Sequence, residues 1–598
     1  MGSILAVFDV GHKSSAVNRV YRMAAVSTYR GQPRVWSDSV AAVGVQSLGW
    51  DASLAWSEEW VVAFHGYVTN WEDVAVVSPG SAANAELLLS LWSEAGRECV
   101  VRLRGEFSVV AYHRCTGRIF LARDFLGKRP LFFSRKDGGL VVASEIRQVI
   151  VGADLPRRLR PEVTIQWIAG LDPPEGATEY EGVLRVAPAA VYTLERADCS
   201  PATSTFWRAP EERDEREVDR EDAKQTLGLL LRRAAQRALV GVEDVAVAVS
   251  SGLDSAALWA LLCQDHPATA TDGRRCSALS LVFPGLSCDE REGVRALHAW
   301  CGTKGREVDA ASESPLARAA YLRERCDRLV HPMAFTIGLL AEEAARQGSR
   351  VLLTAHGPDE VLAGRFSYLA DLLFQGRLAA FLRDCFSVQL RSGRRLRFVA
   401  RQLVAAWRLR KPKARRPAPA WLSPQAWEAI QTRRPAQPPA GLIHSAQIRV
   451  LVSGYQAGPS LDAFEQLAAS AGVEHRSPFL DQDLFDYALT LPGRVLTGGR
   501  RVKWLLRTVL EGRIPDHLRM AWKVGYETLI DRDAEPLRQK LMEATRRNPA
   551  AVLLLTAWGL DNVSLSRHTT EESLRGFRVE RVLAEVGILT LETVEKRV

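Results

Sequence analysis

Closely spaced cysteines are absent from this chain. Its nine cysteines are an odd number, and no two of them stand as C-x-x-C. Both observations argue against a disulfide framework and a structural zinc site, so reduced thiols are expected. Long apolar runs are absent as well, because no stretch approaches the ~18 consecutive apolar residues that a membrane span requires. The N-terminal apolar stretch has no basic region before it, which favours a strand over a signal peptide and predicts a cytoplasmic protein.

Positive charge is confined to one segment. The net charge is +8, yet the stretch from Arg391 to Arg416 holds eleven Lys/Arg and no Asp/Glu, which leaves −3 for the remainder. This stretch lies in an Arg-rich insertion expected at about 377–420. It is typical of a solvated helix face with a tail, or of a docking site for an acidic leader peptide or partner protein. Nucleic acid is not expected as a partner, because only Phe398 and Trp407 interleave as aromatics.

Two patterns divide the 598 residues, which are too many for one compact core. Residues 1–207 read as short strands between turns, and 208–223 read as a charged, proline-containing linker. From 224 to 598 helices alternate with apolar strands, such as DVAVAVS at 244–250 and SRVLLTA at 349–355. This alternation predicts a doubly wound parallel sheet, so the expected fold class is a two-domain α/β protein.

The segment SSGLDS, residues 250–255, follows the first of these apolar strands. Ser250, Ser251 and Gly252 form a loop of small residues whose backbone N–H groups can surround an anion at a helix N-terminus. Asp254 cannot bind phosphate itself, but it can hold a Mg²⁺ that does. The Gly-Lys-Thr/Ser of a Walker loop is missing, and an ordinary capped strand-to-helix turn stays open as the alternative.

Four motifs, in one order along the chain, resemble those of the asparagine synthetase family. SSGLDS is similar to the pyrophosphate loop S-G-G-x-D-S, with Ser251 in place of a glycine. LLTAHGPDE (352–360) resembles L-L-T-G-E-G-x-D-E, and EHRSPFLD (474–481) resembles E-x-R-x-P-F-L-D. KWLLR (503–507) with AWKVGYE (521–527) resembles the lysine loop. The resemblance implies an ATP-pyrophosphatase domain that adenylates its substrate.

The resemblance also implies binding of ATP and Mg²⁺ at the carboxyl ends of the strands, at the switch point of the sheet. Magnesium would lie on Asp254 and Asp359, and Lys523 would offset the charge of the oxyanion and the departing phosphate. A surface lysine in a loop is the alternative for Lys523. The nucleotide would contact Val249, Ser250, Ser251, Gly252, Asp254, Ser255, Val282, Phe283, Thr354, Ala355 and Gly357.

The N-terminal half resembles the glutaminase domain of the same family, an N-terminal-nucleophile-type αββα fold. RLRGEFSVVAY (102–112) and FLARDFLGKRPLFF (120–133) match its framework. The chemistry does not match, because glutamine hydrolysis needs an N-terminal cysteine as nucleophile. Position 2 is Gly2, the first cysteine is Cys99, and the Asn-Gly oxyanion pair reads His65-Gly66. A degenerate domain, kept as a scaffold or docking surface, is expected.

An asparagine synthetase architecture without an ammonia source implies another amine. Two branches of the family use an amine of the substrate: β-lactam synthetases close a small ring, and lasso peptide cyclases join a peptide's N-terminal amine to an Asp or Glu side chain. Asparagine synthetases have a glutamate, and β-lactam synthetases a tyrosine, at the position of His356, so the histidine resembles the lasso branch. We expect an ATP-dependent lasso peptide cyclase that forms an isopeptide macrolactam, releasing AMP and pyrophosphate.

The expected partners are the precursor peptide and the leader peptidase and leader-recognition protein of the same pathway. Four alternatives stay open: a β-lactam synthetase-like enzyme, another small-molecule amide ligase, an asparagine synthetase homologue using free ammonia, and a non-catalytic relative.

His356 is the candidate base of this reaction. A free α-amine has a pKa of about 8 and must lose a proton to react at neutral pH, which an imidazole can accept. Glu465 resembles the acid that partners the base in the β-lactam branch. Glu474 and Arg476 are interpreted as a structural ion pair near the site. A structural histidine would explain His356 equally well from its spacing alone.

Overall fold

The computed structural model describes most of the chain. The described residues are 2–8, 16–49, 52–74, 85–160, 162–163, 166, 176–265, 275–312, 321–322, 324–328, 334–389, 397–401, 403–404, 428, 444–445, 448, 452 and 460–522. Lys523 and most of the basic stretch 391–416 lie outside them. None of the helices in these ranges combines the length and the hydropathy of a membrane-crossing segment.

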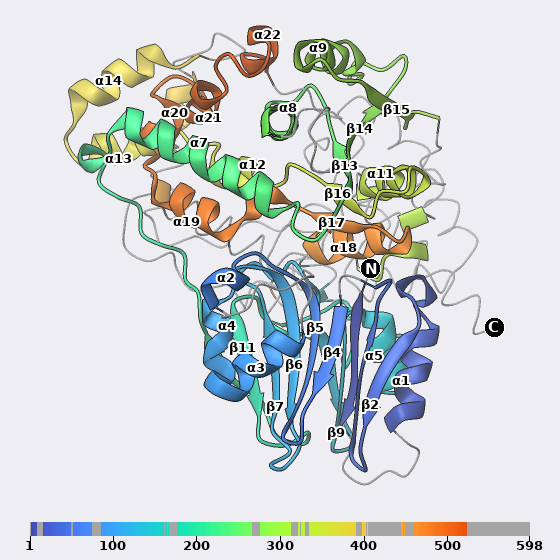
Figure 1. Ribbon diagram of the computed structural model, residues 1–598. Helices are drawn as coiled ribbons and strands as arrows, with labels where there is room; N and C mark the ends of the chain where they lie inside the picture. Colours follow the sequence, from blue (N-terminus) through green and yellow to red (C-terminus); the bar gives the residue numbers. More distant parts are fainter. Residues whose placement is uncertain are drawn as a thin grey trace.

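Two antiparallel six-stranded sheets form the N-terminal domain (Figure 1). The first has the order β10-β8-β9-β1-β3-β2, with the bounds Leu184–Arg185, Phe132–Lys136, Gly139–Ala143, Ser3–Phe8, Ala41–Gln46 and Pro33–Ser37. The second has the order β12-β11-β7-β6-β5-β4, with the bounds Ala202–Thr205, Ala190–Leu194, Ile119–Arg123, Gly105–His113, Trp60–Val68 and Ala52–Trp56. Strand β1 is buried on both faces, which agrees with its apolar run from Ile4 to Phe8.

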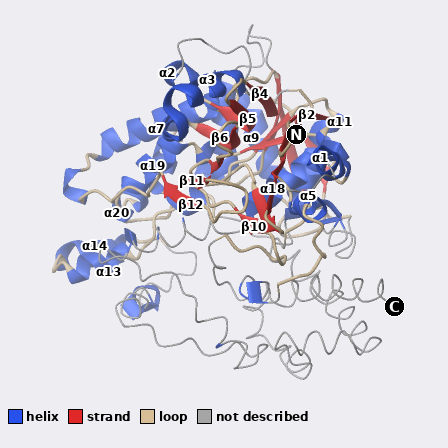
Figure 2. Cartoon of the chain, turned by 90° about the horizontal axis from the view of Figure 1, so that it is seen from below, coloured by secondary structure: helices blue, strands red, loops and turns tan. Residues whose placement is uncertain are grey.

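The two sheets are stacked between helices. Val43 and Leu140 of the first sheet pack with Val110 and Leu121 of the second in one buried cluster. The helices α1 (Ala16–Ala25) and α5 (Ile146–Gly152) cover the outer face of the first sheet (Figure 2). The helices α3 (Ala85–Ala95) and α4 (Cys99–Arg102) cover that of the second sheet (Figure 1). The expected αββα layering of the N-terminal domain is confirmed.

A five-stranded parallel sheet is the centre of the second domain. Its order is β15-β14-β13-β16-β17, with the bounds Gly305–Asp309, Arg275–Val282, Asp244–Ala248, Val351–Leu353 and Glu474–Arg476. All its described pairings are parallel. The chain runs outward from β13 to β15 and then returns to β16 on the other side of β13. The neighbours β13 and β16 therefore form the switch point, where α/β sheets bind their ligands beyond the carboxyl ends.

Helices cover both faces of this sheet, as the sequence predicts. On one face α7 (Arg220–Arg237) and α8 (Leu253–Asp265) pack against β13, and on the other α11 (Phe335–Arg346) and α18 (Ser460–Ser470) do. Helix α7 begins inside the predicted linker, because Asp219 caps it by accepting a hydrogen bond from the Asp222 amide. Within the Arg-rich insertion, α14 (Leu378–Ser387) is a regular helix.

Helix α18 lies next to the N-terminal domain (Figure 1). Buried charges join the two domains there. Asp462 of α18 accepts hydrogen bonds from Arg123 and Arg185 of the N-terminal domain, at 2.9 and 3.2 Å. Arg129 of the N-terminal domain is hydrogen-bonded to Glu474 of β17. Glu474 also forms a two-pronged ion pair with Arg476, with both distances 3.0 Å, which confirms the structural ion pair inferred from the sequence. The interface thus fixes β17, and through it the edge of the parallel sheet.

Candidate functional site

The loop after β13 closes on itself through hydroxyl groups. Ser255, in the first turn of α8, lies with its Oγ 2.8 Å from Ser250 Oγ and 3.1 Å from the Ser250 amide. The Gly252 amide donates to Ser250 Oγ at 3.1 Å. A Cβ on Gly252 would lie 3.1 Å from that same oxygen, so a side chain there would crowd the loop. Two hydroxyls and the backbone amides of a helix N-terminus converge here, and such donors can bind a phosphate.

Ser251 departs from the glycine of the resembled motif, and the structure shows how the loop accommodates it. Its hydroxyl donates to Glu290 Oε1 at 2.9 Å, and Glu290 stands directly before α9 (Arg291–Cys301). The side chain of Ser251 is therefore directed toward α9 and held there. If the loop binds a phosphate, the Ser251 backbone rather than its hydroxyl would contribute.

Two carboxylates from the two switch-point strands meet at one lysine. Asp254 follows β13, and Asp359 lies in α12 (Pro358–Val361), which follows β16. Lys503 Nζ donates to Asp254 Oδ2 and to Asp359 Oδ1, both at 2.5 Å. A cation thus already bridges the pair that the sequence predicts as the magnesium ligands. Oxygen ligands of this kind suit Mg²⁺.

Lys503 is a candidate functional residue that sequence reasoning missed. It lies in the KWLLR motif, directly before α21 (Trp504–Val509). Its position in that motif did not indicate a role for its side chain. Its backbone is left-handed, with φ 56°, which a lysine rarely adopts. Its amide donates to Ala363 O at 2.8 Å, which holds this conformation. Strained backbone is concentrated at functional sites, and here it aims the ammonium group at both carboxylates.

The turn between β16 and α12 requires glycine at one position. Gly357 has φ +122°, and a Cβ there would lie 2.8 Å from Phe479 O.

The two carboxylates that follow this turn, Asp359 and Glu360, differ in their surroundings. Asp359 is bound to Lys503, whereas burial and then the neighbouring Asp359 raise the pKa of Glu360 to about 7. Glu360 is thus partly protonated near neutral pH.

His356 lies at the carboxyl end of β16, half-buried, with its ring fixed on three sides. Its Nδ1 is 2.7 Å from Thr354 Oγ1, and its ring centroid is 4.7 Å from that of Phe464. The His475 ring lies edge-on to it at 5.8 Å. The sequence predicts Thr354 as a nucleotide contact, but its amide donates to Arg476 O and its hydroxyl contacts the two histidines. Thr354 therefore contacts the candidate base directly.

Glu465 is not the partner of His356. Both of its oxygens accept hydrogen bonds from Arg30 of the N-terminal domain, at 2.8 and 2.9 Å, and both side chains are almost fully buried. The sequence resemblance places an acid near the base, but it carries no information on Arg30, which is 435 positions away. Arg30 also binds Glu145 and the carbonyl oxygen of Gly2, so Glu465 belongs to the domain interface.

The same arginine also contacts Gly2, which stands where the resemblance expects the glutaminase nucleophile. Gly2 is buried, and its carbonyl oxygen accepts from Arg30. His65 is fully buried, and neither of its ring nitrogens has a hydrogen-bond partner within the described residues. Burial, and then Arg129 and Arg30, lower the pKa of His65 well below its usual value, so it is neutral. A neutral imidazole and an ion pair thus occupy this end of the degenerate domain.

Replacing Arg30 by leucine is expected to destabilise the protein by about 3–5 kcal/mol, because it leaves Glu465 charged and buried without its partner. Unfolding in urea would measure the loss. Arg118→Leu is the matched control, because Arg118 pairs with Glu195 on the exposed surface, where an ion pair contributes little. The double variant Arg30→Leu/Glu465→Leu should recover part of the stability. A loss no larger than that of the control would contradict a structural role for this pair.

The remaining predicted nucleotide residues lie along the same edge. Val249 and Val282 are buried at the ends of β13 and β14, and Ala355 is half-buried before His356. Phe283 is buried, and its amide donates to Asp289 at 3.2 Å. These apolar side chains face the core. The atoms that these residues can offer to a nucleotide are therefore those of the backbone.

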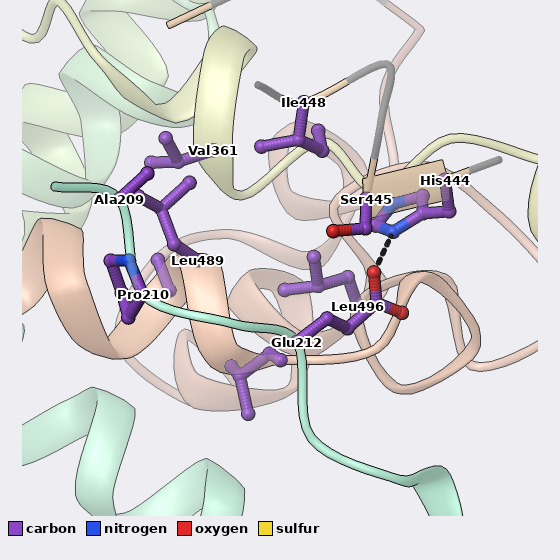
Figure 3. A pocket seen from close by; sticks show the side chains of 11 residues that line it. Ala209, Pro210, Glu212, Val361, His444, Ser445, Ile448, Leu489 and Leu496 are labelled. Carbon is purple, nitrogen blue, oxygen red and sulfur yellow. Dashed lines mark hydrogen bonds and ion pairs between the residues drawn. The ribbon is translucent and has the colours of Figure 1, made fainter. Parts of the chain in front are cut away.

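A small pocket lies behind α12, between the linker and the C-terminal helices (Figure 3). Val361 and Leu489 line it, and His444 Nδ1 lies 3.0 Å from Glu212 Oε2 at its rim. Asp359 and Glu360 of the same short helix are not among its lining residues. Helix α12 thus packs an apolar side chain into this pocket and carries the carboxylates of the candidate site.

Comparison with known proteins agrees with this geometry. Residues 226–583 match the family described as asparagine synthase, and residues 4–207 match the glutamine amidotransferase domain. The chain is 23% identical over 535 residues to a putative glutamine-hydrolysing asparagine synthetase of Mycobacterium bovis, covering 81% of this chain and 77% of the relative. It is 22% identical over 527 residues to the glutamine-hydrolysing asparagine synthetase 1 of Bacillus subtilis, covering 82% and 79%. The amidase chyE of Penicillium rubens is 24% identical over 307 residues, covering 49% and 44%.

Proposed function

Because this chain belongs to the asparagine synthase family, it is an ATP-dependent amide-forming carbon–nitrogen ligase, and we propose that it is a lasso peptide cyclase. It would adenylate an Asp or Glu side chain of a core peptide and join that side chain to the peptide's N-terminal amine. One observation carries the proposal. Asp254, Asp359 and Lys503 are held together as an amide-forming site of this family would need, whereas Gly2 stands where the resemblance expects the cysteine of a glutaminase.

The proposed reaction has two balanced steps. A carboxylate oxygen of the peptide attacks the α-phosphorus of ATP, and pyrophosphate leaves. The α-amine then attacks the acyl carbon, the C–N bond forms, and the C–O bond to AMP breaks. One amine proton passes to His356, and AMP leaves with one oxygen of the original carboxylate.

The residues of the chain divide these tasks. Ser250, Gly252 and Ser255 would bind the pyrophosphate through their backbone amides and hydroxyls. Asp254 and Asp359 fit Mg²⁺, which when bound would offset the charge of the phosphates. Lys503, which bridges the two carboxylates, would then turn to the phosphates, together with the predicted Lys523 from outside the described residues.

The proposed partners are the precursor peptide, the leader peptidase and the leader-recognition protein. One surface suits the docking of a leader peptide. Helix α14 exposes Leu378, Leu382 and Phe386, with exposed fractions of 55, 53 and 70%, four residues apart on one face. The basic stretch 391–416 follows directly, so an amphipathic peptide with acidic residues would complement both features.

The test of this function is incubation with ATP, Mg²⁺ and a synthetic core peptide that has a free N-terminal amine and one internal Asp or Glu. The expected products are AMP, pyrophosphate and a peptide lighter by one water. An N-acetylated peptide is the matched control and should not cyclise. Glutamine should release no ammonia and should not change the yield. Asparagine-type amidation of a free amino acid, or closure of a small-molecule lactam only, would contradict the proposal.

A further inference from the structure

Hydrogen bonds on both sides of its Cα hold the left-handed backbone of Lys503. The Lys503 amide donates to Ala363 O at 2.8 Å, two residues after the end of α12. Arg507 Nε donates to the carbonyl oxygen of Val502 at 3.3 Å, and the Arg507 amide donates to that of Lys503 at 2.9 Å. The two peptide groups that flank Lys503 are therefore both anchored, and Arg507 supplies two of the three hydrogen bonds.

Arg507 is itself held in place by the next helix. Its Nη1 is hydrogen-bonded to Arg519 O, and Arg519 Nη1 donates back to Arg507 O at 3.3 Å. Arg519 lies in α22 (Asp516–Arg519). Because these bonds connect α21 with α22, the guanidinium cannot turn away from Val502 without breaking contacts of both helices.

The guanidinium of Arg507 is buried without a carboxylate partner. Its exposed fraction is 4%, and among the described residues its side chain binds carbonyl oxygens and forms no ion pair. Burial, and then Arg501, lower the pKa of Arg507 to about 10, so the group is still charged at neutral pH. A buried cation without a counter-charge is costly, but its planar set of N–H donors can fix two carbonyl groups at once. This arrangement indicates a role in holding the backbone.

We propose that Arg507 is a positioning residue, which holds the left-handed backbone of Lys503 and thereby keeps the Lys503 ammonium between Asp254 and Asp359. The inference rests on the proposed function, in which Lys503 acts at the phosphates of ATP. A left-handed conformation is unfavourable for a lysine, so without Arg507 the residue would relax toward the right-handed region. The side chain would then leave the backbone in another direction, and the ammonium would leave the two carboxylates.

The backbone part of this proposal can be tested without any substrate. Lys503→Gly and Lys503→Ala both remove the ammonium, but glycine adopts the left-handed region without strain. The midpoint of urea unfolding should therefore be higher for Lys503→Gly, the reverse of the order expected at a right-handed helical position. Adding Arg507→Met to both variants should remove this difference, because residue 503 is then no longer held left-handed. A midpoint of Lys503→Gly that is not the higher one, or a difference that persists unchanged beside Arg507→Met, would overturn the proposal.

The kinetic part compares single and double variants of the full-length protein. Arg507→Met is expected to slow AMP formation in the presence of the peptide between about 10-fold and 100-fold, because a small displacement of a reacting group has an effect of this size. In the Lys503→Ala background the same change should have almost no further effect, since Arg507 acts through Lys503. Arg295→Met is the matched control, because Arg295 pairs with Glu307 on the surface, and it should leave the rate unchanged.

The outcomes separate this inference from the proposed function. Equal losses from Arg507→Met in both backgrounds, with AMP formed by the wild type, would assign Arg507 a merely structural role and leave the function standing. If the wild type forms no AMP with ATP, Mg²⁺ and the peptide, the proposed function fails, while the unfolding comparison still decides whether Arg507 holds the left-handed Lys503. If Arg507→Met does not fold, Arg507→Lys takes its place in both comparisons, because it keeps the charge and loses the planar set of donors.

Discussion

Replacing Asp254 or Asp359 by alanine is expected to abolish AMP formation, with a loss of at least about 10³-fold, because the proposed metal ion would contribute several kcal/mol of charge stabilisation. The two carboxylates lie in the first turns of the helices that follow neighbouring strands, and they share the Lys503 ammonium at 2.5 Å each. Removing either one leaves a single carboxylate, which cannot bind the ion in the same way. AMP and pyrophosphate, separated by chromatography in the presence of the peptide, measure the effect.

The control for this prediction is Asp198→Asn. Asp198 is an exposed carboxylate that pairs with Arg196 between β11 and β12 of the N-terminal domain. This variant should leave AMP formation unchanged. Near-ultraviolet circular dichroism would show that the alanine variants are folded. Persistent AMP formation in both alanine variants would remove these carboxylates from the mechanism, and ADP as the product would contradict adenylation itself.

Replacing His356 by alanine is expected to separate the two chemical steps. Loss of a general base costs about 10²–10⁴-fold, so ring closure should fall by this factor while pyrophosphate release largely survives. The ring lies beyond the end of β16 against Thr354 and Phe464, and not in the loop of Ser250 and Ser255 that is proposed to bind pyrophosphate. Cyclised peptide and pyrophosphate, quantified from the same reaction, give the two rates.

His517→Ala is the matched control, because His517 is an exposed histidine of α22 (Asp516–Arg519) on a different part of the domain. Both rates should stay at the wild-type level in this variant. Full cyclisation by His356→Ala would return His356 to a structural role. A parallel loss of both rates would assign it to nucleotide binding instead.

The layers of the fold and the two loops of the site could be predicted from the sequence for one physical reason. In a parallel sheet all carboxyl ends lie at one edge, so residues that directly follow buried strands are brought together. SSGLDS follows β13, HGPDE follows β16, and these strands are hydrogen-bonded neighbours. The pairing of Asp254 with Asp359 therefore required only the strand assignments and the resemblance of the motifs.

The rest of the site depends on contacts between residues far apart along the chain, which no local pattern encodes. Lys503 contacts Asp254, which is 249 positions away in the sequence. Its left-handed backbone could not be predicted from the residues around it. Both carboxylate oxygens of Glu465 accept hydrogen bonds from Arg30 of the other domain, so Glu465 does not form the predicted acid–base pair with His356. His475 occupies a variable position of its motif, so its buried contact with Thr354 could not be predicted from the sequence.

The most direct test of the central claim follows one oxygen atom. The peptide would be prepared with oxygen-18 in the side-chain carboxylate and incubated with ATP, Mg²⁺ and the full-length protein, and the AMP would be weighed by mass spectrometry. Activation of that carboxylate at the α-phosphorus predicts one oxygen-18 in each AMP, with one oxygen-18 left in the new amide of the cyclised peptide. Unlabelled AMP, or label in inorganic phosphate beside ADP, would contradict the account.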